Sequence, residues 1–246
     1  MSFAIFEEGF YLASYPDVKA AVDAKRFNSG LEHFQKQGLA EGRTSVSAFY
    51  NEQLYLQKYP DVARDVSGAG TLKSGLQHYI EYGEAEGRSP GAFDELAYRQ
   101  KYPDVNAAIA AGAFSSGLQH FIRHGQFEPT RLGIFTGTTG NDTITGLGAA
   151  TNLIGIDVQN PIPDGTGTLN FTNTNYGFGE VDTLIGGSGR DLFYLGATTT
   201  LASSSNLPKS FYVGSSSADY AIIRNFERGK DVITLAGSSL SSYNLG

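Results

Sequence analysis

The residues of this chain that are best suited to chemistry are aspartates in glycine-rich turns of its second half. Residues 186–194 fit the nonapeptide Gly-Gly-x-Gly-x-Asp-x-U-x at every position, where U is a large apolar residue. Residues 177–185 and 137–145 fit it with two glycines and one glycine replaced, respectively. Glycines let backbone carbonyl oxygens approach one another, aspartate adds a charged oxygen, and Ca²⁺ takes about six to eight oxygen ligands. The pattern therefore predicts calcium-binding turns.

A complete calcium site needs two good turns on the same edge of a roll. Such turns belong to alternate nonapeptides, so they are 18 residues apart. Counting back from Asp191 reaches Asn173, and counting back from Asp182 reaches Asp164, both in stretches without the glycines. A calcium-free roll, whose aspartates only close turns, therefore stays open as an alternative. The residues predicted to bind the metal are Gly137, Gly140, Asp142, Asp164, Gly177, Gly179, Asp182, Gly186, Gly187, Gly189 and Asp191.

The elements that must position these turns are short strands. From residue 132 onward, glycine supplies 18 of 115 residues and serine and threonine are frequent, which favours strands and turns over helices. The apolar residue two places after each aspartate (Ile144, Leu184, Phe193) is predicted to point inward. Residues 133–246 are therefore expected to form a parallel β-roll that ends in a strand-rich cap.

Residues 179–196, Gly-Glu-Val-Asp-Thr-Leu-Ile-Gly-Gly-Ser-Gly-Arg-Asp-Leu-Phe-Tyr-Leu-Gly, resemble the calcium-binding repeats of secreted repeats-in-toxin (RTX, hemolysin-type) proteins, particularly cyanobacterial ones. Residues 211–213, 219–226 and 229–235 resemble the cap that ends such rolls. The resemblance implies a calcium-dependent extracellular protein. It also implies type I secretion, through a one-step channel that reads an uncleaved C-terminal region.

Other features of the composition agree with this expectation. The first residues lack the basic segment and apolar run of a cleavable secretory signal, and no apolar run approaches the length of a membrane-spanning helix. The chain has no cysteine, which excludes disulfides, cysteine-ligated zinc and thiol catalysis. Its net charge of −7 argues against a nucleic-acid partner.

The first half contains a threefold repeat. Tyr-Pro-Asp-Val occurs at 15–18, 59–62 and 102–105, and Gly-Leu-(Glu/Gln)-His-(Phe/Tyr) follows each copy. Glu-Gly-Arg closes the first two copies, whereas the third ends in Glu-Pro-Thr-Arg. This self-similarity predicts a stacked array of three helical units followed by the roll, so the chain is expected to be multi-domain, α plus β. The expected boundaries are 1–47, 48–91, 92–132 and 133–246.

Caps and breakers predict short helices in each unit. Asn51 and Asp94 are expected to cap the first helix, where Tyr50 and Phe93 form hydrophobic staples with Tyr55 and Tyr98. The proline of Tyr-Pro-Asp-Val suits the first turn of a second helix, and its aspartate (Asp17, Asp61, Asp104) is expected at that helix start. Ser29, Ser74 and Ser116 are expected to cap a third helix, which Gly38, Gly83 and Gly125 end in the left-handed conformation.

The histidines His33, His78 and His120 occupy one repeat position, which suggests a metal site. However, equivalent positions of stacked helices lie about 8–10 Å apart, too far for nitrogens about 2 Å from one zinc ion. A packing and hydrogen-bonding role is therefore expected. The repeat resembles a module of bacterial surface and polysaccharide-related proteins, which implies an interaction or spacer role.

No catalytic motif is found, and paired carboxylates such as Glu7-Glu8 and Asp94-Glu95 lie at expected helix starts, so we expect no enzyme. The leading expectation is a secreted calcium-binding structural protein of the cell surface or extracellular matrix that self-assembles into a homo-oligomer or filament, with Phe3, Phe6 and Phe10 buried by a neighbouring copy. The alternative is a secreted, adhesin-like module that binds a glycan or another polysaccharide. Its sugar-stacking residues would be Tyr11, Tyr15, Tyr55, Tyr59, Tyr98 and Tyr102.

Overall fold

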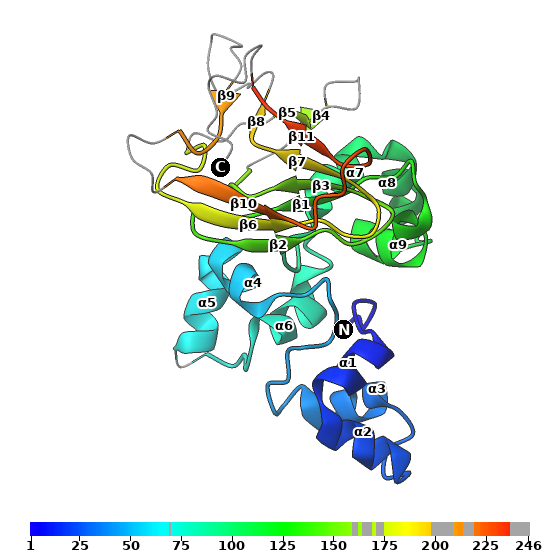
Figure 1. The fold of residues 1–246 in the computed structure, drawn as a ribbon. Coiled ribbons are helices and arrows are strands. Elements are labelled where there is room, and N and C mark those ends of the chain that lie inside the picture. The colour runs from blue at the N-terminus through cyan, green and yellow to red at the C-terminus, as the bar shows by residue number, and fades with distance from the viewer. Residues whose placement is uncertain are drawn as a thin grey trace.

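The computed structural model describes residues 1–68, 70–158, 162–163, 169–170, 175–197, 209–213 and 219–236. Over these residues the chain is mixed α and β, with helices first and parallel sheets after them (Figure 1). This confirms the expected α plus β composition. None of the helices in these ranges is long and apolar enough to cross a membrane.

Three successive helical units form the first half. Each has two short α-helices that meet at a Tyr-Pro bend, and then a third helix that ends in a π-helical or 3₁₀ turn. The bounds are α1 Glu8–Ser14, α2 Pro16–Asp23, α3 Gly30–His33 with η1 Phe34–Gly38; α4 Glu52–Lys58, α5 Pro60–Ser67, α6 Gly75–His78 with η2 Tyr79–Gly83; and α7 Glu95–Lys101, α8 Pro103–Ala110, α9 Gly117–Arg123 with η3 Gly125–Phe127.

The predicted caps and staples are confirmed. Asn51 and Asp94 accept hydrogen bonds from the backbone N–H groups of Leu54 and Ala97, which closes the first turns of α4 and α7. The serine caps accept from Glu32, Gln77 and Gln119, respectively. The staple rings lie 5.0, 5.9 and 5.2 Å apart between centroids for Phe6–Tyr11, Tyr50–Tyr55 and Phe93–Tyr98.

The repeated histidines bind repeated tyrosines, as the packing interpretation predicts. The Tyr hydroxyl and His Nδ1 are hydrogen-bonded at 3.0 Å in Tyr11–His33, 2.9 Å in Tyr55–His78 and 3.1 Å in Tyr98–His120. The three tyrosines are 0% exposed. Each pair therefore joins the first helix of a unit to the third.

The prediction that Gly38, Gly83 and Gly125 adopt the left-handed conformation is wrong. Their φ angles are negative, and the glycines with positive φ in the corresponding loops are Gly42 and Gly87, both at 72°. A Cβ at Gly38, Gly83 or Gly125 would instead overlap the hydroxyl of the buried tyrosine in the same unit. Steric space, rather than backbone conformation, requires glycine there.

The arginine that ends each copy pairs with the aspartate of Tyr-Pro-Asp-Val. Arg43 and Arg88 contact Asp17 and Asp61 at 2.7 and 2.8 Å, and Arg131 contacts Asp104 at 2.5 Å. Each guanidinium also lies over a tyrosine ring, at 4.7–5.0 Å from the centroids of Tyr15, Tyr59 and Tyr102. The third copy lacks the Glu-Gly-Arg sequence, but its arginine forms the same ion pair with the aspartate of Tyr-Pro-Asp-Val.

Two parallel sheets form the second half, and the chain alternates between them. One sheet has the order β1 (Gly133–Thr136), β3 (Ala150–Ile154), β7 (Arg190–Tyr194), β11 (Val232–Thr234). The other has the order β10 (Tyr220–Arg224), β6 (Val181–Ile185), β2 (Thr143–Thr145). Two antiparallel pairs, β4 (Ile162–Pro163) with β5 (Leu169–Asn170) and β8 (Gly196–Ala197) with β9 (Lys209–Ser210), lie between the parallel strands in sequence.

Residues that pair between neighbouring strands of these sheets are mainly 40 positions apart in the sequence, rather than the expected 18. Gly133 faces Thr151, which is an 18-residue step, but Ile144 faces Leu184 and Leu153 faces Phe193. The longer steps accommodate the antiparallel pairs. Ile144, Leu184 and Phe193 are fully buried, as predicted, and pack in one core cluster that continues into the helices.

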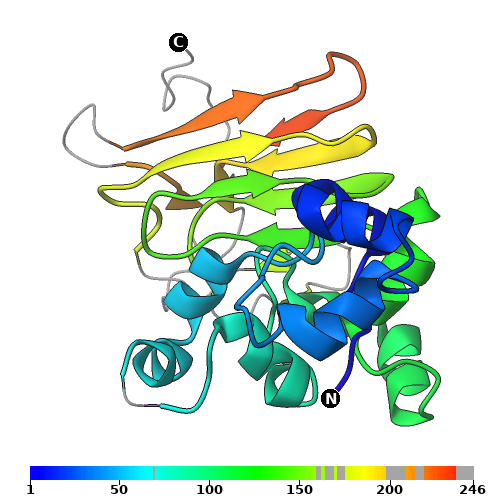
Figure 2. The ribbon, with the colours of Figure 1, turned by 90° about the horizontal axis from the view of Figure 1, so that it is seen from below.

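The second and third helical units lie nearest to the sheets, and the first unit lies farthest from them (Figure 1). Figure 2 shows β10 and β11 on the side of the sheets away from α4–α9. The backbone N–H of Glu7 donates to Val46 at 2.9 Å, and that of Asn51 donates to Pro90 at 3.2 Å, so each unit binds the segment that leads into the next. In the third unit, Asp94 donates to Ile134 of β1 at 2.8 Å. Strand β1 thus takes the position of the segment that would lead into a fourth unit.

Candidate functional site

The glycine-rich turns bring the predicted aspartates to two edges of the sheets. Turns 137–142 and 177–182 precede β2 and β6 and form the first edge. Turns 146–151, 186–191 and 226–231 precede β3, β7 and β11 and form the second edge. The side chains of Asp142, Asp182, Asp191 and Asp231 are all buried. The predicted ligand Asp164 lies outside the described residues.

On the first edge, the aspartates close turns and connect neighbouring coils. Asp142 Oδ2 accepts from the backbone N–H of Thr138 at 2.5 Å and from its hydroxyl at 3.0 Å. Asp182 Oδ1 accepts from the N–H of Asp142 at 2.8 Å, and its Oδ2 accepts from the Tyr212 hydroxyl at 2.7 Å. Both oxygens of Asp182 are therefore occupied, as in the calcium-free interpretation.

On the second edge, Asp231 and Asp191 differ in how many of their carboxylate oxygens accept a hydrogen bond. Asp231 Oδ1 accepts from the N–H of Asp191 at 2.9 Å, and its Oδ2 accepts from the N–H of Glu227 at 2.8 Å. Asp191 Oδ1 accepts from the Thr151 hydroxyl, but its Oδ2 has no hydrogen-bond partner although the residue is 0% exposed. Burial raises the pKa of Asp191. The backbone N–H of Gly187 and the ammonium of Lys230 act on this carboxylate in the opposite direction and favour its charged form.

The glycines of turn 186–191 pack closely against backbone carbonyls of turn 146–151. A Cβ at Gly187 would lie 2.8 Å from the carbonyl oxygen of Gly146, and one at Gly189 would overlap the carbonyl of Ala149. A Cβ at Gly186 would lie 2.8 Å from Asp191 Oδ2. Turns 146–151 and 186–191 therefore offer carbonyls and one carboxylate, a donor set that suits Ca²⁺.

The other pair of turns on the second edge has its own cation. The ammonium of Lys230 donates to the carbonyl of Ser188 and lies 3.1 Å from Glu227 Oε2. A lysine thus supplies positive charge between turns 186–191 and 226–231.

Sequence reasoning missed Glu180 and Asp219 on the first edge. Glu180 is 3% exposed; its Oε1 accepts from Asn175 Nδ2 at 2.6 Å, but its Oε2 has no partner. Asp219 Oδ1 accepts from the N–H of Gly179 at 2.9 Å, and its buried Oδ2 has no partner. Glu180 occupies a glycine position of the nonapeptide, and this replacement is the signal that could have indicated a role.

The acidic surroundings of the first edge make ionisation costly. Burial, and then the charges of Asp182, Asp142, Asp157 and Asp219, raise the pKa of Glu180 to about 7. Burial also raises the pKa of Asp182 to about 6. Within the described ranges, no three His, Asp or Glu side chains gather closely enough to hold a metal by themselves. A bound cation would therefore depend on backbone carbonyls as well.

The surfaces expected for sugar stacking and self-assembly are partly covered. Tyr11, Tyr55 and Tyr98 are buried, so they cannot stack on a sugar. Phe3 packs edge-on against Phe34 with ring centroids 6.1 Å apart, and Phe6 packs against Tyr11. Of the three expected contact residues, Phe10 alone is exposed.

A polar cavity of about 470 Å³ lies where the helices meet β1. Its lining includes Lys58, Asp94, Thr136 and Asp157. Lys58 Nζ donates to the carbonyls of Gly91 and Thr136 at 3.0 and 3.1 Å and to Thr136 Oγ1 at 3.1 Å, so its hydrogen atoms are used to join the helices to the sheet.

Comparisons of this chain with protein-family models, with curated proteins and with solved structures find no match.

Proposed function

We propose that the protein is a secreted calcium-binding structural protein of the cell surface or extracellular matrix. In this proposal residues 133–246 form a calcium-stabilised β-roll, and the helical units 1–47, 48–91 and 92–132 form a repeat array that serves assembly. The observation that carries the proposal is Asp191, a fully buried carboxylate with one oxygen lacking a partner.

A buried, incompletely paired carboxylate destabilises a fold unless a proton or a cation compensates its charge. Asp191 Oδ2 and the carbonyls of turn 146–149 would hold the ion, and Ca²⁺ would supply the compensating charge. Calcium bound to the folded state alone stabilises it by mass action. Scarce calcium in the cytoplasm and abundant calcium outside the cell would then favour folding after export by the one-step route.

Assembly would use the exposed surface of the helical array. Phe10, 38% exposed on α1, is the remaining apolar contact candidate of the first unit. The alternative function, binding of a polysaccharide, is favoured by the polar cavity at Lys58 and Asp157 and not by Tyr11, Tyr55 and Tyr98, which are buried.

Calorimetric titration of Asp191→Asn with Ca²⁺, together with its thermal unfolding, tests the proposal. We expect the variant to fold, because asparagine keeps the shape and the bond to Thr151, but to lose the calcium-induced rise in unfolding temperature that we expect of the parent. Asp23→Asn, on the exposed surface of α2, is the control and should respond like the parent. An unchanged calcium response of Asp191→Asn would contradict the proposal.

A further inference from the structure

We propose that strand β10 pairs with the same strand of a second copy of the chain, so that two molecules join in a symmetric dimer. The contact uses the open edge of β10, which is the side that does not face β6. The proposed function assigns assembly to the helical array, whereas this interface lies in the other half of the chain and does not involve Phe10.

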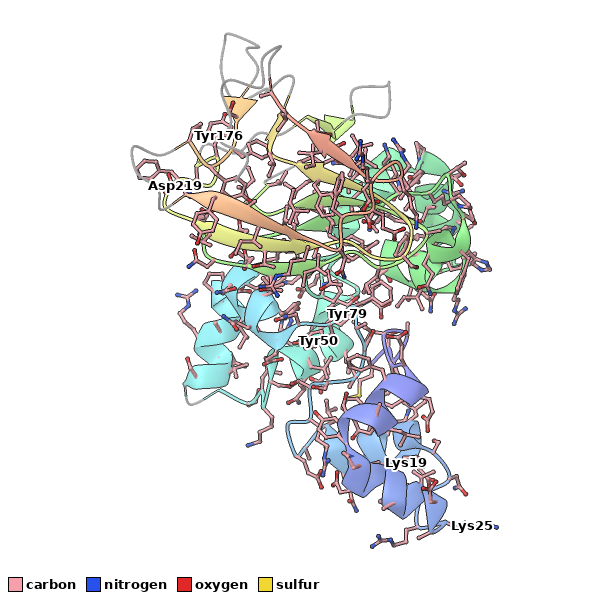
Figure 3. All side chains as sticks on the ribbon, in the orientation of Figure 1. Lys19, Lys25, Tyr50, Tyr79, Tyr176 and Asp219 are labelled. Carbon is pink, nitrogen blue, oxygen red and sulfur yellow. The ribbon has the colours of Figure 1, made fainter. Side chains whose placement is uncertain are left out.

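The two ends of the sheets differ in how they are closed. At one end, the segment before α7 pairs with β1, through the hydrogen bonds from Asp94 to Ile134 and from Thr136 to Ala92. At the other end, β10 pairs with β6 and β11 pairs with β7, and neither has a second neighbour among the described strands. Figure 3 shows Asp219, directly before β10, on the side of the sheets away from α4 and α5.

The apolar core is incompletely covered at this end. Leu184 and Phe193 are 0% exposed, whereas Ile223 and Ile233, their partners in β10 and β11, are only partly buried. Natural edge strands are commonly protected by proline or lysine, and β10 contains neither. An apolar edge of this kind gains free energy when another strand covers it.

The hydrogen bonds to β6 show which backbone groups of β10 point to the open edge. The N–H of Tyr220 donates and the carbonyl of Arg224 accepts in hydrogen bonds of 3.1 and 3.0 Å with the backbone at the two ends of β6. In a parallel pair, alternate residues direct both backbone groups to the same neighbour. Ala221 and Ile223 therefore direct their N–H and C=O groups to the open edge.

One antiparallel register makes two copies of β10 complementary. A twofold axis at Ile222 pairs Ala221 of each copy with Ile223 of the other, and each pair exchanges two backbone hydrogen bonds. The same register places Tyr220, which is 47% exposed, opposite the exposed Arg224 of the other copy. Apolar residues then face apolar residues, each guanidinium lies beside an aromatic ring, and no like charges are opposed.

Analytical ultracentrifugation of the full chain in saturating calcium, over a series of protein concentrations, tests the dimer. We expect a monomer–dimer equilibrium in the parent. Tyr220→Lys opposes two positive charges and should raise the dimer dissociation constant about tenfold, and adding Arg224→Glu should restore it, because opposite charges then face each other. Phe10→Ser, on the helical array, is the control and should dimerise like the parent.

Cross-linking tests the register, because the chain has no cysteine of its own. In Ile222→Cys the two thiols would face each other across the axis, with Cα atoms about 4.5 Å apart, which permits a disulfide. In Arg224→Cys the two thiols would lie about 13 Å apart along the strands, so this variant is the matched control and should not cross-link.

Three results would overturn the proposal. They are a parent that stays monomeric at every concentration, a dimer that Phe10→Ser abolishes and Tyr220→Lys does not, and cross-linking of Arg224→Cys in place of Ile222→Cys. If Tyr220→Lys does not fold, the two cysteine variants decide. The proposal about Asp191 is judged by the unfolding temperature in calcium, so either proposal can fail without the other.

Discussion

The backbone N–H of Asp94 donates to the carbonyl of Ile134 at 2.8 Å, and this hydrogen bond joins the last helical unit to the first strand of the sheets. The return bond, from the N–H of Thr136 to Ala92, measures 2.7 Å, and the ring centroids of Phe93 and Phe135 lie 5.9 Å apart. The two halves of the chain therefore share a continuous joint, and changes in one half should reach the other.

Lys58→Met should weaken this joint. The ammonium binds Gly91 and Thr136, and its charge opposes those of Asp94 and Asp142, so its loss leaves acceptors and buried carboxylates uncompensated. We expect the free energy of unfolding to fall by about 2 kcal/mol in urea denaturation. The exposed Lys73→Met is the control and should change it by less than about 0.5 kcal/mol. Equal effects of the two substitutions would mean that Lys58 does not support the joint.

Calcium should stabilise the helices as well as the sheets, because the joint couples them. At a calcium concentration 100 times Kd, binding adds about 2.7 kcal/mol, and the unfolding temperature should rise by about 5–10 °C. The amide NMR signals of the helices and of the strands should be lost together on heating, and both transitions should shift with calcium. A helical transition that ignores calcium while the strand signals move would show that the halves unfold independently.

Gly83→Ala and Gly9→Ala should have opposite effects on stability. A Cβ at Gly83 overlaps the Tyr55 hydroxyl, so we expect a loss of about 1–3 kcal/mol, part of which Tyr55→Phe restores in the double variant. Gly9 lies in α1 with no atom within 4 Å of its Cβ position, so alanine there should add about 0.5–1 kcal/mol. Chemical denaturation of the four proteins gives both numbers, and a neutral Gly83→Ala would refute the steric explanation of the repeated glycine.

Glu180 should make stability depend on pH when calcium is absent. Its pKa is raised to about 7, so the folded state binds the proton more tightly than the unfolded chain, and stability falls as the pH rises from about 4.5 to about 7. Asp182 changes the stability in the same direction as Glu180. Burial lowers the pKa values of His78 and His120, so these two histidines make the folded state less stable as the pH falls below about 6.5. The comparison with Glu180→Gln isolates the glutamate.

We expect Glu180→Gln to be more stable than the parent by about 1–2 kcal/mol near pH 8 and to lose this advantage near pH 5. Urea denaturation in a chelating buffer at both pH values measures the difference. A difference that does not vary with pH would show that Glu180 is not the titrating group.

Arg131 should hold the pKa of Asp104 low, as Arg88 does for Asp61. The hydrogen bonds from Arg88 lower the pKa of Asp61 to about 2, and those from Arg131 lower the pKa of Asp104. In Arg131→Gln, an NMR titration of the carboxyl carbons should show the pKa of Asp104 moving toward 3.8, with Asp61 unchanged as the internal control. Because Asp104 is largely exposed, stability should change by less than about 1 kcal/mol.

The sequence by itself determined the local elements. Caps, staples and prolines specify the helices through contacts between residues a few positions apart, and the alternation of glycine turns with apolar residues specifies strands with Ile144, Leu184 and Phe193 inside. The repeated His33, His78 and His120 were predicted to pack because one repeat position cannot converge on one metal ion. All of these inferences depend on spacing along the chain.

The tertiary structure alone decided which oxygens are free and which glycines are needed for space. Asp182 and Asp191 look alike in the sequence, but the Tyr212 hydroxyl, 30 residues away, binds the second oxygen of Asp182, whereas no side chain binds that of Asp191. Gly83 is required by Tyr55, and Asp219 reaches Gly179 across a 40-residue step. A turn motif fixes the conformation of its own residues, but the partners of a buried side chain come from the neighbouring coil, whose register depends on the lengths of the intervening segments.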